Sequence, residues 1–300
     1  MIKAQGLSKS FGEIQALNHI SLTIRKEAVF GLIGTNGAGK STFLRLLAGV
    51  LKADSGDILI EEKSVYENPI VKESFFFIPD DPYYFPNSRP LDMRDYYALV
   101  YQYFDKKQFD HLLKAFDLLG SRKINTFSKG MKKQLAIISA LAAHTPYIFC
   151  DETFDGLDPV MRQAVKSLFA EAMAERGLTP LIASHNLREL EDICDHVGLL
   201  HQGGILLTRD LEGLKLGVQK VQAVFDPPLR YQEDFMDLEV QSIKHSGALH
   251  TMIVQGERRQ VEARLAAYAP LYLEILPLTL EEVFLYETEV VGYDIKSLLL

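Results

Sequence analysis

The chain has 300 residues, 47% hydrophobic and 24% charged, which is typical of an ordinary globular protein with one large or two modest domains. Its formal net charge of -8 disfavours nucleic acid as the main partner, because surfaces that bind phosphate backbones are usually basic. The sequence has no run of about 18 apolar residues and therefore no predicted membrane span. We expect no secretory signal peptide, and we expect Cys150 and Cys194 to be reduced and packed.

Predicted strands and helices alternate through the first 215 residues. In chain order they are strands at 2–8, 19–24 and 28–34, a helix at 40–51, a strand at 75–78, helices at 91–104, 107–119 and 130–144, a strand at 147–150, a helix at 159–176, a strand at 179–183 and a helix at 186–195. The apolar run at 28–34 is typical of a strand buried on both faces. This alternation indicates an α/β fold with a largely parallel sheet.

The pattern changes beyond about residue 215. Three strand-like segments, VQKVQAVF, VQSIKH and ALHTMIV, are followed by a helical ERRQVEARLAAYA, a strand LYLEIL and a helix TLEEVFLYE. Residues 216–300 are therefore predicted to form a small α+β appendage to the main domain at 1–215. The appendage carries no motif with recognisable chemistry.

A glycine-rich loop, GTNGAGKST at residues 34–42, follows the buried strand and opens an amphipathic helix. Its glycines let successive backbone N–H groups face phosphate oxygens, and the helix N-terminus adds positive dipole. Lys40 is suited to the β- and γ-phosphates, and the Ser41 hydroxyl is suited to Mg²⁺. The loop with its strand and helix predicts a nucleoside triphosphate site.

Polar residues also follow two later strands. YIFCDE places Asp151 and Glu152 after an apolar strand, and LIASHN places His185 after the next one. We expect Asp151 to hold Mg²⁺ through water and Glu152 to align or deprotonate an attacking water. His185 is expected to reach the γ-phosphate from the same sheet edge, although a lone histidine is more often structural.

A second helix start, in FSKGMKK at residues 127–133, also presents bare backbone N–H groups to an anion. One nucleotide per chain does not need two such sites. The alternative interpretation is an ordinary Ser128 N-cap with Lys132 and Lys133 on a solvated face.

The phosphate loop, FSKGMKKQLA, YIFCDETFDGLDP and ASHN together resemble the ATP-binding subunit of an ABC transporter. The resemblance covers roughly residues 1–215. It implies a P-loop NTPase core of the ABC-ATPase type, with a helical signature subdomain at about 81–130 before the C-terminal appendage. It further implies ATP and Mg²⁺ as cofactors, and an active ATPase in which two subunits sandwich two ATP molecules.

The resemblance also assigns further positions. Ser128 and Gly130 bind the γ-phosphate of ATP held by the other subunit, Asp158 lies across the dimer interface, and Phe11 stacks on adenine, although Phe11 could instead be a core residue. The expected ATP-binding residues are Phe11, Asn36, Gly37, Ala38, Gly39, Lys40, Ser41, Thr42, Ser128, Gly130 and Asp158. Glu152 and His185 are the expected catalytic residues, and Ser41, Asp80 and Asp151 the expected metal ligands.

Four residues depart from the family pattern. Asp80 stands where the family usually has glutamine. Its side chain is shorter, so whether it reaches the attacking water is an open question, although it could still bind Mg²⁺. Lys129 replaces a glycine, Met131 replaces a glutamine and Thr153 replaces a proline. Lys40, Asp151, Glu152 and His185 are all retained.

The family resemblance implies integral membrane permease subunits as partners and a position on the cytoplasmic side of the membrane. The helical subdomain would form their docking groove, and it is rich in aromatic residues: Tyr96, Tyr97, Tyr101, Tyr103 and Phe104. We expect about half of these rings to fill the subdomain core. LTLEEVFL near the chain end resembles the ending of bacterial drug, antibiotic and peptide exporter subunits, which favours export.

Two alternatives stay open. One is a soluble ABC-type ATPase that acts on DNA or ribosomes, which the negative charge, the single phosphate loop and the lack of sustained heptads disfavour. The other is a weakly active subunit of a heterodimeric transporter, which Asp80 and the altered signature keep possible. The sequence does not distinguish a homodimer from a heterodimer, and it does not identify the transported substrate.

Overall fold

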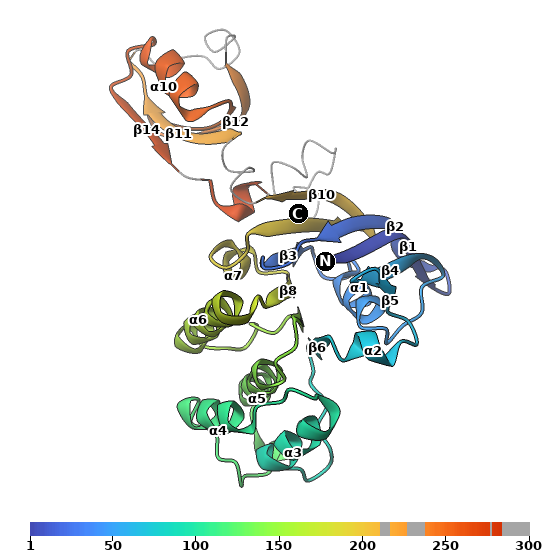
Figure 1. Ribbon diagram of the computed structural model, residues 1–300. Helices are drawn as coiled ribbons and strands as arrows, with labels where there is room; N and C mark the ends of the chain where they lie inside the picture. The colour runs from blue at the N-terminus through green and yellow to red at the C-terminus, as the bar shows by residue number, and fades with distance from the viewer. Residues whose placement is uncertain (211–216, 227–237, 277, 284–300) are drawn as a thin grey trace. The chain divides into compact units, whose positions relative to one another are not determined.

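Figure 1 shows the computed structural model, which describes residues 1–210, 217–226, 238–276 and 278–283. Residues Met1–Thr208 form one compact unit and Arg209–Leu300 form a second. This division lies slightly before the expected boundary near residue 215. In the part of the chain that the structure describes, no helix combines the length and apolar character that a membrane crossing requires.

The first unit is built around a six-stranded sheet in the order β10-β9-β3-β8-β7-β6. Its strands are β3 (Phe30–Ile33), β6 (Phe75–Ile78), β7 (Tyr147–Asp151), β8 (Thr179–Ser184), β9 (His196–His201) and β10 (Gly204–Asp210). The pairs β3–β8, β3–β9, β7–β8 and β6–β7 are parallel. Every residue of β3, β7 and β8 is buried, as the apolar runs predict.

A second sheet of four strands is formed by residues near the start of the chain, in the order β2-β1-β4-β5. It consists of β1 (Ile2–Phe11), β2 (Ile14–Ile24), β4 (Ser55–Ile60) and β5 (Lys63–Ser64). β1 and β2 are longer than expected because they pair antiparallel up to a tight turn at Gly12, where Phe11 faces Ile14. This sheet, helix α1 (Lys40–Leu47) and the central strands share one apolar core.

The helical part of the first unit lies between β6 and β7 in the sequence (Figure 1). Its elements are α3 (Pro90–Val100), α4 (Lys106–Ala115), a 3-10 turn (Ile124–Thr126) and α5 (Lys129–Ala142), with the short α2 (Pro69–Lys72) before β6. α3 ends four residues before the expected Phe104, because the Asp105 side chain accepts backbone N–H groups of Lys107 and Gln108 and starts α4. α6 (Pro159–Arg176) and α7 (Leu187–Glu191) follow later.

The second unit is a small α+β fold, as expected. Its antiparallel sheet has the order β12-β13-β11-β14, with β11 (Val218–Val224), β12 (Glu239–Ser246), β13 (Leu249–Gln255), α10 (Arg258–Ala266) and β14 (Tyr272–Leu276). Alternate residues of β11 and β13 are buried, and Val261 and Leu265 of α10 pack against them. The last predicted helix, TLEEVFLYE, lies partly outside the described residues.

Both cysteines are free and buried, which confirms the prediction of packed thiols. Cys150 lies in β7, where burial raises the pKa of its thiol to about 12. Cys194 packs against β3, and a β-carbon on Gly31 would lie 2.8 Å from its sulfur. Neither thiol is in the thiolate form that chemistry would need.

Gly56 allows β4 to cross β1 closely. It has a φ of 78°, and a β-carbon there would lie 2.4 Å from the carbonyl oxygens of Gln5 and Gly6. Gly12 is the matched control, because its φ is 60° but a β-carbon there would meet nothing within 4 Å. Gly12→Ala should cost only backbone strain, about 1–2 kcal/mol.

We predict that Gly56→Ala lowers the free energy of unfolding by a further ~1–3 kcal/mol, since the added methyl group collides with main chain. Urea unfolding of the full chain, followed by circular dichroism, measures both variants. Equal losses in the two variants would show that the β1–β4 crossing has room for a side chain.

Candidate active site

The glycine-rich loop joins β3 to α1. Gly39 has a φ of 107°, and a β-carbon there would lie 2.5 Å from the Ala16 carbonyl oxygen. At Gly34 a β-carbon would lie 2.5 Å from the Leu200 carbonyl oxygen. Both positions therefore require glycine, and the tight turn directs the N-terminal N–H groups of α1 at the loop, where they can bind an anion.

Lys40 is buried and folds back over this loop. Its ammonium donates to the carbonyl oxygens of Gly34 at 2.7 Å and Thr35 at 3.2 Å. The same ammonium lies 3.2 Å from Glu152 Oε1. A buried cation is thus held directly beside backbone N–H groups that suit phosphate oxygens.

Ser41 and Asp151 form an oxygen pair next to Lys40. The Ser41 hydroxyl donates to Asp151 Oδ1 at 3.0 Å. Burial raises the pKa of the Asp151 carboxyl, the Ser41 hydrogen bond opposes that rise, and nearby Glu152 adds to it. A cation placed here would relieve this penalty.

The donor set fits Mg²⁺. That ion commonly takes only one or two protein oxygens and completes its shell with phosphate and water. Ser41 and Asp151 can supply those two oxygens beside the phosphate loop. Among the described residues no group of three or more His, Cys, Asp or Glu side chains could hold a metal ion by itself. The fit is therefore to a cation that arrives with a phosphate ligand.

Glu152 and His185 meet at the ends of β7 and β8. His185 Nδ1 lies 2.9 Å from Glu152 Oε2, while Glu152 Oε1 faces Lys40. Glu152 has a φ of 48°, an uncommon backbone conformation for a non-glycine residue, and its N–H donates to the Ala183 carbonyl oxygen at 2.9 Å. The structure thus brings Lys40, Glu152 and His185 together, as the sequence predicts.

Ser128 and Gly130 lie at the N-terminus of α5. The Ser128 hydroxyl accepts the Met131 N–H at 3.2 Å, so Ser128 is an N-cap, while its role toward a partner's nucleotide stays a prediction. A β-carbon on Gly130 would lie 2.8 Å from the Gly156 carbonyl oxygen, which explains a glycine there. No hydrogen bond or ion pair of the described residues joins Ser128 or Gly130 to the phosphate loop of the same chain.

Phe11 lies at the end of β1, and Asp158 lies at the start of α6. The Phe11 side chain is 47% exposed at the end of β1, with the Lys9 ammonium 5.6 Å from its ring centroid, so the core alternative is wrong. Asp158 Oδ1 accepts the N–H groups of Val160 and Met161, both at 2.9 Å, and caps α6. Their roles toward adenine and a dimer partner stay predictions.

Asp80 and Lys133 form an ion pair that sequence reasoning missed. The alternative N-cap interpretation places Lys133 on a solvated face, and this part of it is wrong: Lys133 is 0% exposed and its ammonium lies 3.0 Å from Asp80 Oδ1. The Lys129 ammonium lies 3.4 Å from the same oxygen. Partial burial acts to raise the pKa of Asp80, but the two lysines outweigh it and lower the pKa. The role of Asp80 as a metal ligand stays a prediction. A metal ion would have to compete with the ammonium groups of Lys129 and Lys133, which already pair with this carboxylate.

The burial of Lys133 could have been detected from the sequence. Lys133 lies four residues before the buried Ile137, and therefore on the same face of α5. That face is otherwise apolar, so helical spacing places a charge in the core. Only the fold, however, shows which carboxylate lies opposite.

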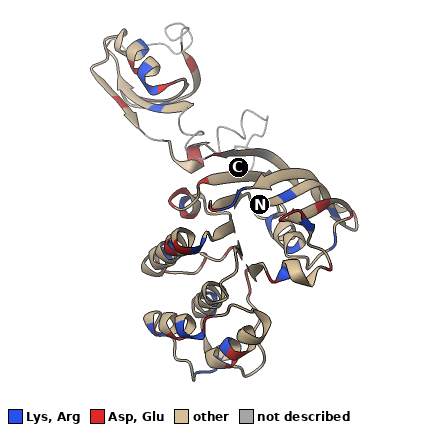
Figure 2. Cartoon of the chain, viewed as in Figure 1, with Lys and Arg blue, Asp and Glu red and all other residues tan. Residues whose placement is uncertain are grey.

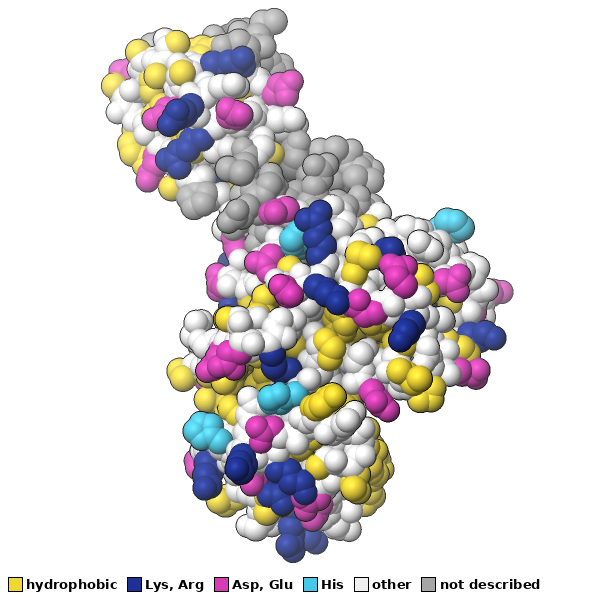
Figure 3. Space-filling view, in the orientation of Figure 1, with side chains coloured by type: hydrophobic (Ala, Val, Ile, Leu, Met, Phe, Trp, Pro, Cys, Tyr) yellow, Lys and Arg dark blue, Asp and Glu magenta, His cyan; other side chains and the backbone are white. Residues whose placement is uncertain are grey.

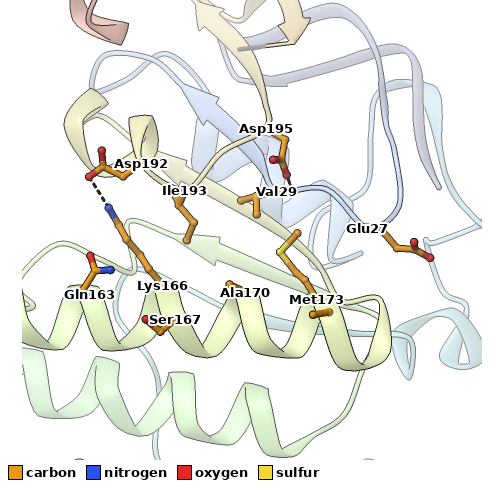
Figure 4. A pocket seen from close by; sticks show the side chains of 11 residues that line it. Glu27, Val29, Gln163, Lys166, Ser167, Ala170, Met173, Asp192, Ile193 and Asp195 are labelled. Carbon is orange, nitrogen blue, oxygen red and sulfur yellow. Dashed lines mark hydrogen bonds and ion pairs between the residues drawn. The ribbon is translucent and has the colours of Figure 1, made fainter. Parts of the chain in front are cut away.

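A cavity of about 780 Å³ lies along α6, away from the phosphate loop (Figure 4). Lys166 reaches across it to Asp192 at 3.0 Å, and Asp195 Oδ2 accepts the Val29 N–H at 2.7 Å. None of the predicted site residues lines this cavity. This cavity is therefore separate from the predicted nucleotide site.

Residues 17–155 match the family model described as "ABC transporter". ABC transporter ATP-binding protein YtrB of Bacillus subtilis is 31% identical over 95% of this chain and 97% of its own length. Lantibiotic transport ATP-binding protein SrtF of Streptococcus pyogenes is 31% identical over 71% of this chain and 92% of its own, and bacitracin transport ATP-binding protein BcrA of Bacillus licheniformis is 30% identical over 72% and 71%.

A solved ATP-binding subunit of an ABC transporter superposes with a TM-score of 0.66 at 26% identity, over 72% of this chain and 92% of that one. The fold and the site define an ABC-class ATPase, an enzyme that hydrolyses ATP. The chain belongs to the family of ABC transporter ATP-binding proteins.

We predict that Lys40→Ala weakens ATP binding by about 100-fold, because a charged hydrogen-bond donor worth up to about 3 kcal/mol is lost. Isothermal titration with ATP measures the change. Lys166→Ala is the matched control, since Lys166 is also a largely buried lysine paired with a carboxylate, but it lies at the α6 cavity. Equal ATP affinity in the two variants would contradict the assignment of the loop.

Proposed function

We propose that this ATPase works in an ATP sandwich of two ATP-binding subunits and powers export by a membrane transporter. One observation carries the proposal. The phosphate loop and its carboxylates converge at one sheet edge, whereas among the described residues no hydrogen bond or ion pair joins Ser128, at the exposed start of α5, to the loop or to the side chains of Asp151 and Glu152. A second anion-ready helix start has a use only if another subunit brings its nucleotide there.

Within one chain, each predicted residue has a task in the proposed site. Backbone N–H groups of Asn36, Gly37 and Ala38 in the loop, and of Thr42 in the first turn of α1, hold the phosphates, and Lys40 exchanges Glu152 for the γ-phosphate. Mg²⁺, when bound beside Ser41 and Asp151, supplies positive charge that the phosphate oxygens share.

The hydrolytic step belongs to Glu152 and His185. Glu152 leaves Lys40 once phosphate has arrived, and its carboxylate is then free to accept a proton from the attacking water. His185 orients Glu152 through the 2.9 Å contact and faces the phosphate from the end of β8. The pair resembles a general base with its orienting partner.

The groove beside the helical subdomain supports a membrane partner. A cavity of about 530 Å³ lies between α1, α2, β6 and α3, and Phe76, Tyr97 and Tyr101 line it. Phe76 stacks with Tyr101 at 5.3 Å and packs edge-on against Tyr97 at 5.2 Å. Tyr96 and Tyr103 are exposed, so the aromatic residues divide between subdomain packing and accessible surface.

Further apolar side chains are exposed in and just before α3, beyond the residues that line this groove. Tyr83 and Phe85 are exposed and pack edge to face at 6.2 Å, and Leu99 on α3 is 88% exposed. Exposed aromatic clusters are typical of binding surfaces. We assign this groove to a cytoplasmic segment of an integral permease, which would keep the chain at the cytoplasmic side of the membrane.

Export is supported by relatives and by the tail. SrtF and BcrA are named for lantibiotic and bacitracin transport. The LTLEEVFL segment resembles exporter subunits, although it lies partly outside the described residues. A nucleic-acid partner is disfavoured by charge: Lys and Arg alternate with Asp and Glu along the chain (Figure 2), and the face in Figure 3 mixes both signs.

The transporter proposal is tested by capture of partners. Tagged Glu152→Gln chain is expressed in its native cell, trapped with Mg-ATP, solubilised gently and analysed by mass spectrometry. We expect a protein with several membrane spans to co-purify, and a second ATPase beside it would mean a heterodimer. Recovery with ribosomal or DNA-bound proteins from the soluble fraction would contradict the transport proposal and leave the ATPase intact.

The sandwich is tested by Ser128→Arg. The added side chain would block the partner's γ-phosphate, so we predict at least a ~100-fold loss of hydrolysis, as when an oxyanion donor is removed. ATP binding to the isolated chain should stay unchanged, because Ser128 does not contact its own loop. Ser167→Arg, at an exposed position of α6, is the control. Normal hydrolysis in Ser128→Arg would rule out a composite site.

A further inference from the structure

Lys133 is a fully buried lysine in the second turn of α5. Ammonium groups are almost never buried without partners, because the lost hydration has to be replaced by charge and hydrogen bonds. Nothing in the proposed site so far uses this side chain. Its partners therefore show what the buried charge does.

Two groups accept hydrogen bonds from the Lys133 ammonium. It donates to Asp80 Oδ1 at 3.0 Å and to the main-chain carbonyl oxygen of Glu152. Asp80 follows β6 and Glu152 follows β7, so one side chain joins α5 to the ends of two strands. The neighbouring residue strengthens this junction, because the Tyr84 hydroxyl donates to the Lys132 carbonyl oxygen at 2.7 Å.

Glu152 depends on its surroundings for its conformation. Its φ of 48° is unfavourable for a residue with a side chain and persists only where neighbouring contacts fix it. The Glu152 N–H donates to Ala183, and its carbonyl oxygen accepts from Lys133 and from the Asp155 N–H at 3.2 Å. Of these three contacts, only the Lys133 contact is charged and comes from α5.

We propose that Lys133 is a positioning residue for hydrolysis: its ammonium, anchored by Asp80, fixes the main chain of Glu152 and thereby the direction of the Glu152 carboxylate. The inference rests on the proposed role of Glu152 as general base. It adds a link between the helix that begins at Ser128 and the carboxylate that activates water, because Lys133 lies in that same helix.

The first test is Lys133→Met in the full chain. Methionine has an uncharged, apolar side chain of similar length. The carboxylate of Asp80 loses Lys133 in this variant, but it is half-exposed and can be solvated by water. We expect kcat for ATP hydrolysis to fall about 10- to 100-fold, since small displacements of a catalytic group have effects of this size. The KM and Kd for ATP should stay within about 2-fold, because the phosphate loop is untouched.

Lys132→Met is the matched control. It makes the same substitution one position away on α5, at a residue that does not contact Glu152 through its side chain. Its kcat should match that of the unaltered chain. Equal losses of kcat in the two variants would overturn the proposal, because they would reflect α5 in general.

A double variant separates positioning from general stability. If Lys133 acts through Glu152, then Lys133→Met combined with Glu152→Gln should have the same residual kcat as Glu152→Gln alone, within about 2-fold. Losses that multiply would mean that Lys133 acts independently, and they would overturn the inference. A normal kcat in Glu152→Gln would instead refute the proposed base, while a large loss there with normal Lys133→Met would refute this inference alone.

If Lys133→Met does not fold, Lys133→Gln takes its place. Glutamine carries an uncharged amide with two N–H donors on a shorter side chain, so it retreats from the Glu152 carbonyl oxygen without burying a new charge. The same non-additivity with Glu152→Gln is expected. A normal kcat in Lys133→Gln, or losses that multiply in its double variant, would overturn the proposal.

Discussion

The parallel alignment of β3, β8 and β7 is the constraint on which the site depends. β3 pairs with β8 so that Ile33 lies opposite Ser184, and β7 pairs with β8 so that Asp151 lies opposite Ala183. The three strands therefore end at the same edge, and the residues that follow them meet there. Every residue in these strands is buried, so their backbone N–H and C=O groups have no access to water. They are satisfied by pairing with the neighbouring strand, which favours this register. Catalytic geometry here is a consequence of strand packing.

The charges at that edge balance one another before any nucleotide arrives. Lys40 satisfies Glu152 and two loop carbonyl groups, while His185 contacts the other oxygen of Glu152. In the proposed function an entering phosphate would compete for the Lys40 ammonium, and the carboxylate that loses Lys40 would become available to water. Asp151 lies beside this exchange as a buried carboxyl with a raised pKa, and a divalent cation is the partner that would favour its ionised form. In this proposal, binding of the nucleotide and activation of Glu152 would be two results of one change of ionic partners.

The sequence was sufficient for contacts that follow from local geometry. The phosphate loop, Asp151, Glu152 and His185 each follow a strand that its apolar run identifies, so their convergence could be predicted. The Lys133–Asp80 pair could not, because its partners are 53 positions apart and meet only through packing of α5 against β6. Helix ends were also missed where a competing cap decides them: α3 stops because Asp105 begins the next helix. Local patterns located the site, whereas its charged supports depended on tertiary contacts.

Those supports connect the apolar groove to the carboxylate by continuous contacts. Tyr97 of α3 and Tyr101, which directly follows that helix, pack on Phe76 in β6, and the chain that leaves β6 carries Asp80. Asp80 holds Lys133, and Lys133 holds the carbonyl of Glu152. A partner of the kind proposed for this groove would contact β6, the strand that precedes Asp80. Contacts alone do not establish coupling, which requires an element with two arrangements that both sites influence. The buried Lys133 ammonium is the group that both sites would influence, because it donates at once to Asp80 and to the main-chain carbonyl oxygen of Glu152.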